Sequence, residues 1–469
     1  MGYIRHLFLL KMQIEMAYLF QVVSQNDSQV AAIESIQFDN LVSYLKVYLG
    51  TLPDYRIGSN ISYSMLDAAL SAFSVFFTQS PSFLAHQNQM QQAKGKNNAL
   101  SLFQVENIPS DNQIRNLLDP VSPSHLTPIF NYVYEKLDAA GTLDNYRFLN
   151  DTILIALDGV CYHSSNKISC KNCNTKKNKN GSTSYLHSAI TPVIVAPKKT
   201  HVISLPPEFI TPQDGHEKQD CEHEAVKRWL NKHATTYQQK GVTFLGDDLY
   251  SCQPTCVAII NAGCHFVFTC KPDSHKTLYE WMGDFQRQGE ITTVSVERKH
   301  VKKKYKDTYS FVNKLPLRDS DDSLFANWCE IISTDKNGKV LYQNAFITDH
   351  KITKDNVADI VSAGRARWKI ENENNNTLKT KGYNFEHNFG HGKEHLSQTL
   401  LTLNILSFLY HTALSFIDLA YQLIREKLPT RKTFFDDLRA LTRYMHFESW
   451  QHIMQFMMEG LEINTPNSS

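Results

Sequence analysis

The spacing of hydrophobic positions predicts helices throughout the first 145 residues. Apolar side chains recur at helical intervals over 38–49 and 65–77, and a shorter amphipathic helix is expected to follow the turn and N-cap at Pro109 and Ser110 and to end at Leu118. The Gln- and Asn-rich stretch 87–98 lacks this pattern, so it is predicted to be an exposed loop or linker. The chain should therefore begin with a helical domain over 1–145.

Near residue 150 the pattern changes to continuous apolar runs, which are typical of strands buried on both faces. One such run ends in Asp158 and another in Asp247. The expected elements, in order, are a strand over 151–157, a hairpin of 189–196 with 200–205, a helix over 221–239, a strand over 242–246, a helix over 253–261 and a strand over 265–270. This alternation predicts an α/β core over 146–276 with a mixed sheet flanked by helices.

The rest of the chain is predicted to complete this core around an insertion. Short alternating stretches indicate an antiparallel, β-rich insertion over 277–350. A helix is expected from 353 to about 381 and a long apolar helix over 396–428, both within a final core segment over 351–430. Residues 431–469 carry a weaker helical pattern and are expected to form a C-terminal helical tail.

Composition and charge narrow the class of protein. The 469 residues are 42% hydrophobic and 20% charged, an ordinary balance for a folded protein. The formal net charge of +1 disfavours a protein that coats nucleic acid everywhere, but it allows local basic patches. Nine irregularly spaced cysteines argue against a secreted disulfide scaffold and for a reducing cytoplasm.

The first residues resemble a signal peptide only briefly. Lys11 and Glu15 interrupt the apolar run, and no small-residue cleavage site follows. We expect no membrane-spanning helix, because no stretch approaches the roughly 20 apolar residues that such a helix requires. We therefore expect a cytoplasmic protein with no membrane partner.

Three acids stand where a metal site could form. Asp158 and Asp247 each end a buried strand, the edge at which open α/β sheets bind ligands. Glu371 lies on the predicted helix, one turn after Arg367. Either Asp alone could be a turn or cap residue, and Glu371 alone could be a solvated helix residue. Together, three carboxylates need cations, and a pair of Mg²⁺ ions suits such oxygen ligands.

These acids lie in segments that resemble the catalytic domain of cut-and-paste DDE transposases of bacterial insertion sequences. The segments are Ala156-Leu-Asp-Gly-Val, Leu245-Gly-Asp-Asp-Leu-Tyr and Gly364-Arg-Ala-Arg-Trp-Lys-Ile-Glu-Asn, within a likeness that spans about 150–415. That family has an RNase H-like fold, and one large branch carries a β-rich insertion before the last acid. The resemblance implies that Asp158, Asp247 and Glu371 hold two Mg²⁺ or Mn²⁺ ions. Asp248 and Glu373 are the alternatives for the second and third acids.

The surroundings of the last acid depart from this branch at two positions. The branch carries a Tyr, Arg, Glu and Lys signature, of which Arg367 and Glu371 match in spacing. The Tyr position is occupied by Gly364 and the Lys position by Leu378, with Lys379 one residue later. In the family these residues act on a flipped base and on DNA phosphates during hairpin formation. The route of cleavage therefore stays open.

The resemblance implies an enzyme that cleaves DNA at transposon ends and joins the ends to target DNA by two-metal phosphoryl transfer. Its partners would be terminal inverted repeats and target DNA, held by a homodimer associated with the bacterial nucleoid. The helical N-terminal domain could bind the DNA ends or serve as a scaffold. The alternatives are an RNase H-like nuclease without strand transfer and an inactive, transposase-derived DNA-binding protein. The presence of all three acids disfavours the inactive protein.

A cysteine- and histidine-rich segment over 161–187 predicts a zinc knuckle on an irregular loop. The candidate ligands are His163, Cys170, Cys173 and His187, with Cys161 as an alternative. Thiolates select zinc, and the segment is too polar to order itself through a core of its own. Free thiols in a surface loop are the competing interpretation.

Basic residues form two candidate DNA contacts. The denser run lies in the insertion and contains Arg298, Lys299, Lys302, Lys303 and Lys304. The second group surrounds Glu371 and contains Arg365, Arg367, Lys369, Lys379 and Lys381. Such runs are often solvated faces, but in a DNA enzyme of near-zero net charge they are the expected phosphate contacts. His391, which lies between His387 and His395, is expected to touch DNA or the active site.

Overall fold

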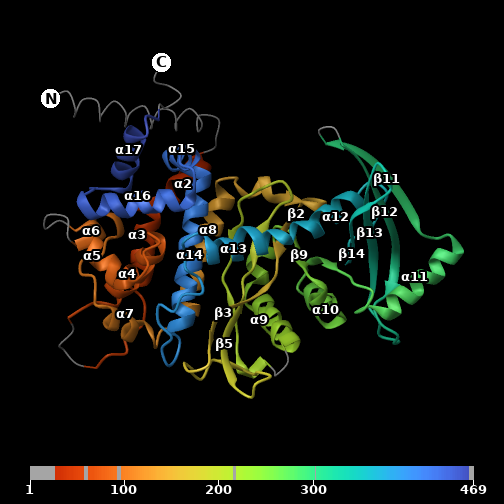
Figure 1. Ribbon diagram of the computed structural model, residues 1–469, viewed down its shortest axis with the longest axis horizontal. Coiled ribbons are helices and arrows are strands. Elements are labelled where there is room, and N and C mark those ends of the chain that lie inside the picture. The colour runs from red at the N-terminus through yellow and green to blue at the C-terminus, as the bar shows by residue number, and fades with distance from the viewer. Residues whose placement is uncertain (1–26, 58–61, 92–96, 215–217, 301–302, 464–469) are drawn as a thin grey trace. The chain divides into compact units, whose positions relative to one another are not determined.

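The computed structural model describes residues 27–57, 62–91, 97–214, 218–300 and 303–463 (Figure 1). The chain divides into two compact units. The helical unit comprises Met1–Asn145, Ile168–Asn172 and Thr377–Ser469, and the sheet unit comprises Tyr146–Lys167 and Cys173–Asn376. The opening segment, which we expect not to be a signal peptide, lies outside the described residues.

The sheet unit is built on a mixed sheet with the strand order of RNase H-like folds (Figure 1). Its central strands are β2 (Thr152–Ala156), β6 (Val193–Val195), β7 (Ile203–Ser204), β9 (Val242–Gly246) and β10 (His265–Thr269), and the short β1 (Arg147–Phe148) also pairs with β2. The order is β7-β6-β2-β9-β10: β2 is antiparallel to β6 and parallel to β9, and β9 is parallel to β10. Both β2 and β9 are buried along their whole length, as their largely apolar sequences predict. The predicted RNase H-like α/β fold is confirmed.

The insertion is antiparallel, as predicted, and it extends this same sheet. Its strands are β11 (Thr292–His300), β12 (Lys303–Pro316), β13 (Phe325–Asp335) and β14 (Val340–Thr348), and a helix, α11 (Lys276–Gln288), precedes them. β14 pairs with β10, so the two sets of strands form one continuous sheet. The pattern did not predict α11 as a helix. It also did not predict β12, because the lysines at the start of this strand obscure its alternation.

A second, smaller sheet replaces the irregular loop expected after Asp158. It consists of β3 (Gly159–Ser165), β4 (Asn174–Lys177), β5 (Thr183–Ile190) and β8 (Glu208–Ile210). The prediction of one strand over 189–196 is therefore wrong, because Ile190 pairs with Gly159 in this small sheet whereas Val193 begins β6 in the large one. Pro192 stands at the break, where its missing N–H could not have continued a ladder.

Helices cover the sheet and carry the last of the three acids. They are α9 (Lys218–Gln238), α10 (Gln253–Asn261) and α12 (Val357–Ala366), with α12 packing on β9, β10, β12 and β13. After α12 the single helix expected to residue 381 becomes a π-helical segment, Ile370–Asn375, followed by α13 (Asn376–Thr380). Short 3-10 turns lie at Leu149–Asp151, Pro212–Asp214 and Asp248–Ser251.

The helical unit packs around α4 (Met65–Phe77), which is buried along almost its whole length. The other helices are α2 (Asp27–Ser35), α3 (Phe38–Leu49), α5 (Phe83–Gln91), α6 (Asn98–Phe103), α7 (Asp111–Leu118), α8 (Thr127–Ala139), α14 (Leu396–Ile417), α15 (Leu419–Lys427), α16 (Arg431–Tyr444) and α17 (Trp450–Gly460), with 3-10 turns at Pro123–Leu126 and Leu143–Tyr146. The helices predicted over 38–49 and 65–77 are confirmed, as is the helix predicted to follow Ser110 and end at Leu118. The exposed loop predicted over 87–98 is wrong for residues 87–91, which close α5 and bury Met90, and for Asn98, which is buried at the start of α6, while 92–96 lie outside the described residues.

The helix predicted over 396–428 is two helices, α14 and α15. It breaks at Asp418, whose carboxylate accepts a hydrogen bond from Tyr421 N at 2.9 Å and so caps α15. By length and composition alone, α14 could cross a membrane, contrary to our expectation from the sequence. The most apolar stretch of α14 is 83% buried, as expected of a core helix.

Candidate active site

The sheet brings Asp158 and Asp247 to the same edge. β2 and β9 are parallel neighbours whose register pairs Ala156 with Leu245, and Leu157 N donates to Leu245 O at 2.8 Å. Asp158 and Asp247 each lie two residues beyond this pair. Because parallel strands end at a common edge, the two carboxylates follow adjacent strands at the same level, as the strand-end pattern predicts.

Glu371 joins these acids from the π-helical segment that follows α12. Arg367, one turn earlier and largely buried, donates from Nη1 to Glu371 Oε1 at 2.7 Å. A π-helical turn is uncommon and often occurs at functional sites, since it re-aims side chains that a regular helix would direct elsewhere. Among the charges that act on the pKa of Asp158, that of Glu371 is the largest, which favours Glu371 over the alternative acid Glu373.

The surroundings of Asp158 disfavour the ionised form of its carboxyl group. Burial, followed by the charges of Glu371, Asp247 and Glu222, raises the pKa of Asp158 to about 7, while Arg367 opposes the shift. Three neighbouring carboxyl groups therefore act on Asp158 against one guanidinium group. Divalent cations would supply the missing positive charge, and carboxylate oxygens are the ligands that Mg²⁺ and Mn²⁺ prefer. The oxygen ligands of Asp158, Asp247 and Glu371 are of the right kind for such ions, but the three acids are not among the groups of described residues whose ligand atoms all lie within 4.8 Å of one another.

A fourth acid, Glu222 on α9, stands beside Asp158 and is not predicted by the sequence. Its side chain is buried, and Tyr250 Oη donates to its Oε2 at 3.3 Å. A Cβ atom on Gly159 would lie 2.6–2.7 Å from the Glu222 carboxyl group, so a larger residue directly after Asp158 would have to displace the end of the Glu222 side chain. In the sequence Glu222 is one acid of a polar helix, and the glycine after Asp158 is the only signal that anything approaches the chain there.

Asn375 in the π-helical segment binds Asp158, and Asn374 orients Asn375; neither residue was predicted. Asn375 Nδ2 donates to Asp158 Oδ2 at 3.0 Å. Asn375 Oδ1 accepts from Thr191 Oγ1 at 3.0 Å and from Asn374 Nδ2 at 2.9 Å, which fixes the orientation of its amide. The same short segment thus delivers Glu371 and orients Asp158.

The neighbouring residues Asp247 and Asp248 differ in what their side chains bind. Asp248 accepts hydrogen bonds from Lys271 N at 2.6 Å and from Ser274 Oγ, so both of its oxygens hold the loop after β10. Asp247 accepts one hydrogen bond, from Leu249 N at 3.0 Å, and acts on the pKa of Asp158. Both line a cavity of about 430 Å³. The contacts of Asp248 are structural, which favours Asp247 as the second acid.

The two departures from the transposase signature have packing reasons. A Cβ atom on Gly364 would lie 2.5 Å from the Phe346 ring of β14, so no larger side chain fits in this structure at that helix position. Leu378 is fully buried in the helical unit, and the adjacent Lys379 forms an ion pair with Glu386 at 2.7 Å. Neither signature position is open to a polar side chain.

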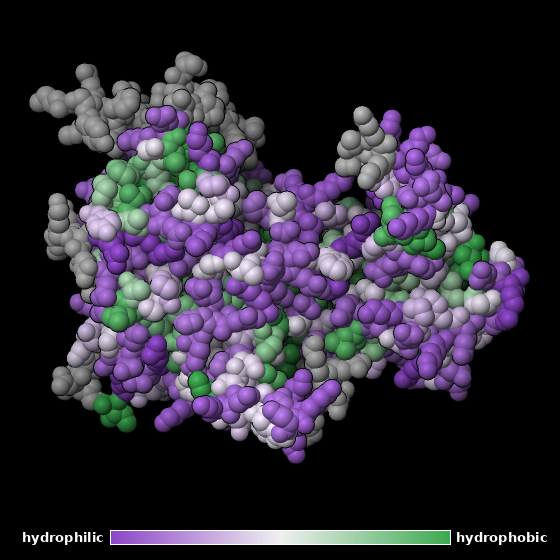
Figure 2. Space-filling view, viewed as in Figure 1, coloured by the Kyte–Doolittle hydropathy of each residue, from purple (hydrophilic) through white to green (hydrophobic). Residues whose placement is uncertain are grey.

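Some of the predicted DNA-binding residues contact other residues of the protein. Arg298 pairs with Asp307, Arg365 stacks over the Tyr342 ring at 4.5 Å, and Lys369 Nζ donates to Lys199 O at 2.6 Å. Lys299 and Lys304 are exposed and face each other in the β11–β12 register. The surface over these strands is mostly hydrophilic (Figure 2). Lys302 and the side chain of Lys303 lie outside the described residues.

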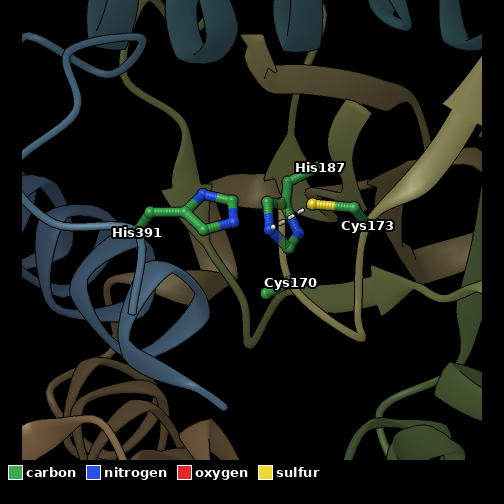
Figure 3. Close-up of side chains that lie close together, drawn as sticks. All are labelled: Cys170, Cys173, His187 and His391. Atoms are coloured by element: carbon green, nitrogen blue, oxygen red, sulfur yellow. Dashed lines mark hydrogen bonds between the residues drawn. The ribbon is translucent and has the colours of Figure 1, made fainter. Parts of the chain in front are cut away.

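The predicted zinc ligands Cys173 and His187 are in contact. In the sheet unit, Cys173 Sγ lies 3.4 Å from His187 Nε2, and both side chains are buried (Figure 3). His163 pairs with His187 across β3 and β5, but it does not share a set of metal-ligand distances with Cys173 and His187. In the helical unit, Cys170 and His391 offer ligand atoms within 4.8 Å of each other. His391 is buried, so the expected contact with DNA does not fit its position.

Comparisons with known proteins add no evidence about function to this geometry. No protein-family model and no curated protein matches the chain. Among solved structures, a piggyBac transposase synaptic complex with hairpin DNA is similar at 9% identity with a TM-score of 0.38, over 94% of this chain and 86% of that chain. Similarity this low carries no weight for function, so the fold rests on the strand order and the site on its own contacts.

Proposed function

We propose that this protein is a metal-dependent DNA transposase that cleaves transposon ends and joins them to target DNA. The observation that carries the proposal is that Asp158 and Asp247 follow adjacent parallel strands at the same level, with the charges of Glu371 and Asp247 raising the pKa of Asp158. The resemblance of the segments around these acids to DDE transposases supplies the reaction. A homodimer would hold the two DNA ends.

Asp158, Asp247 and Glu371 would hold two Mg²⁺ or Mn²⁺ ions, which when bound activate water and stabilise the leaving oxygen in phosphoryl transfer. The protein's own contribution is to orient the ligands. Asn375 fixes one oxygen of Asp158, and Arg367 fixes one oxygen of Glu371. Glu222 adds negative charge beside Asp158 and is positioned by Tyr250.

The experiment that tests this function uses the purified chain, a labelled duplex that carries the element's ends, and Mg²⁺. A transposase nicks the duplex and joins the freed 3′ ends to target DNA. An RNase H-like nuclease cuts without joining, and an inactive DNA-binding protein retains the duplex without cutting. If the protein cuts DNA without joining the ends, the transposase proposal is wrong. If it binds DNA without cutting, the proposal that it is an enzyme is wrong.

The exposed lysines of the β11–β12 hairpin are proposed to contact DNA phosphates. We expect the charge-reversing pair Lys299→Glu and Lys304→Glu to weaken DNA binding and to reduce the dependence of log Kd on log salt by roughly 0.9 for each phosphate that is no longer neutralised. Fluorescence anisotropy over a salt series measures both quantities. The matched control is Lys336→Glu with Lys339→Glu, which reverses two exposed lysines in the β13–β14 turn. Equal effects of the two pairs would show only a general influence of net charge.

We also propose that the protein binds one structural zinc ion through Cys170, Cys173 and His187. Cys173 Sγ lies 3.4 Å from His187 Nε2, and the Cys-x-x-Cys spacing of the sequence keeps Cys170 near Cys173. Thiolates and imidazoles are the ligands that structural zinc sites use. His163, the fourth residue of the sequence-based set, does not share metal-ligand distances with Cys173 and His187.

Metal content tests the zinc proposal directly. Protein purified without chelator should contain one zinc per chain, and Cys173→Ser and His187→Ala should lose it, whereas His163→Ala should keep it. Co²⁺ substitution should give the absorption of a tetrahedral site with thiolate ligands. Loss of zinc in His163→Ala would restore the original ligand set. Absence of zinc from the wild-type protein would remove the site.

A further inference from the structure

Cys252 occupies an unusual position among the cysteines that the structure describes. It immediately precedes α10 and so lies at the positive end of the helix dipole. Pro254 occupies the first turn of this helix. Its side chain is partly exposed and lines the 430 Å³ cavity that Asp247 also lines. A cysteine that is accessible and lies at a helix N-terminus has two of the properties of a reactive thiol.

A histidine on the neighbouring helix provides the third property. Cys252 Sγ lies 3.7 Å from both ring nitrogens of His223 on α9. Thr255 Oγ1 joins the two groups, since it lies 3.3 Å from Cys252 Sγ and 2.8 Å from His223 Nδ1. The arrangement brings a thiol, an imidazole and a hydroxyl group into mutual contact beside a cavity.

The electrostatics of the pair agree with this geometry. Burial acts to raise the pKa of the Cys252 thiol, but the hydrogen bonds from His223 and Thr255 and the charge of His223 outweigh it, so the pKa lies below its ordinary value. Burial acts to lower the pKa of His223, but the contact with Cys252 outweighs it and the pKa is raised. Lys227 and Glu222 act on His223 with opposite signs. The charged groups that line the cavity beside Cys252 are Asp247, Asp248, Lys271, His275 and Arg318.

In four buried cysteines, by contrast, the pKa of the thiol is raised and not lowered. Burial raises the pKa of the thiols of Cys256, Cys264, Cys270 and Cys329. Cys256 lies one turn after Cys252 on the same helix and is fully buried. The environment of Cys252 is therefore specific to its place between the cavity and His223.

We propose that Cys252, paired with His223, is a reactive thiolate and a site of covalent modification by soft electrophiles and peroxides. With a peroxide, the sulfur attacks one oxygen, the O–O bond breaks, and the departing hydroxide takes the imidazolium proton to leave water and a sulfenic acid. With iodoacetamide, an S–C bond forms and iodide leaves with the electron pair of the C–I bond. Either adduct stands in the cavity that Asp247 lines, so modification would obstruct the active site; this consequence rests on the proposed function.

Labelling of the intact, full-length protein tests the reactivity without reference to DNA. With limiting iodoacetamide at pH 7, peptide mass spectrometry should show Cys252 alkylated about tenfold faster or more than the exposed Cys161. His223→Gln should slow Cys252 to the rate of Cys161, whereas His125→Gln, at an exposed position of the helical unit, should change nothing. Equal rates for Cys252 and Cys161 in the wild-type protein would overturn the proposal, and this comparison requires no variant to fold.

The consequence for the active site is tested separately. Pretreatment with hydrogen peroxide or iodoacetamide should reduce DNA cleavage by the wild-type protein in step with the fraction of Cys252 modified, and Cys252→Ser should resist the treatment. If Cys252 is labelled fast but DNA cleavage is not reduced, the proposed obstruction of the active site is wrong, whereas the reactive thiolate at Cys252 stands. Fast labelling in a protein that never cuts DNA would count against the proposed function and not against the reactive pair.

Discussion

Replacing Asp158 with Asn is expected to lower the rate of DNA cleavage by about 10³-fold or more, because a metal ligand contributes several kcal/mol to the transition state of phosphoryl transfer. Asp158 is the acid on which the other three act, and Asn375 already binds one of its oxygens. An amide of the same size keeps the packing of the strand end but cannot share its charge with a cation. DNA binding should persist, since the proposed phosphate contacts lie elsewhere.

The comparison with Asp151→Asn separates catalysis from general damage. Asp151 precedes the same strand, β2, and its side chain is 81% exposed. Cleavage by this variant should stay within about threefold of wild type, because exposed substitutions away from a site change little. Single-turnover cleavage and gel-shift binding on the same duplex give both readouts. If Asp158→Asn cleaves at the wild-type rate, the assignment of the site is wrong.

A second large effect is expected on the stability of the metal-free protein. The pKa of Asp158 rises from an ordinary value of 3.8 to about 7 in the folded state, so the folded protein binds an extra proton between those values. Stability in EDTA should therefore fall as pH rises from about 4 to about 7 and then level off, by at most roughly 4 kcal/mol. Asp158→Asn removes this ionisation. In EDTA at pH 8 it should raise Tm by roughly 5 °C or more relative to wild type, and near pH 4 the two proteins should differ little.

Thermal unfolding in EDTA at the two pH values measures this directly, with Asp151→Asn again as the control. Added Mg²⁺ should reverse the order at pH 8, because cations stabilise the wild-type acids and find fewer ligands in the variant. An Asp158→Asn protein that is less stable than wild type in EDTA at pH 8 would contradict the crowding of charge described above.

The sequence identifies the residues of the site that end strands. An apolar run that stops at an acid predicts both a buried strand and the edge at which it ends, which is why Asp158 and Asp247 fall on adjacent strands at one level. Glu371 follows from its spacing to Arg367, and the contact between them exists. Such local patterns allow correct predictions because they depend only on neighbours within a few residues along the chain.

Residues that reach the site from distant segments could not be predicted in the same way. Glu222 lies 64 residues after Asp158 in a polar helix, and Asn375 belongs to a turn whose π-helical geometry leaves no mark in hydrophobic periodicity. The small sheet around β5 was missed because its strands are partly exposed and carry few apolar residues.

The central claim is that Asp158, Asp247 and Glu371 bind divalent cations together. Anomalous diffraction from crystals of the protein containing Mn²⁺ tests it most directly, because the signal locates the ions without reference to activity. We predict anomalous peaks between the carboxylates of Asp158, Asp247 and Glu371, and none there in crystals of Asp158→Asn. Crystals containing Mn²⁺ in which these carboxylates hold no ion would contradict the account.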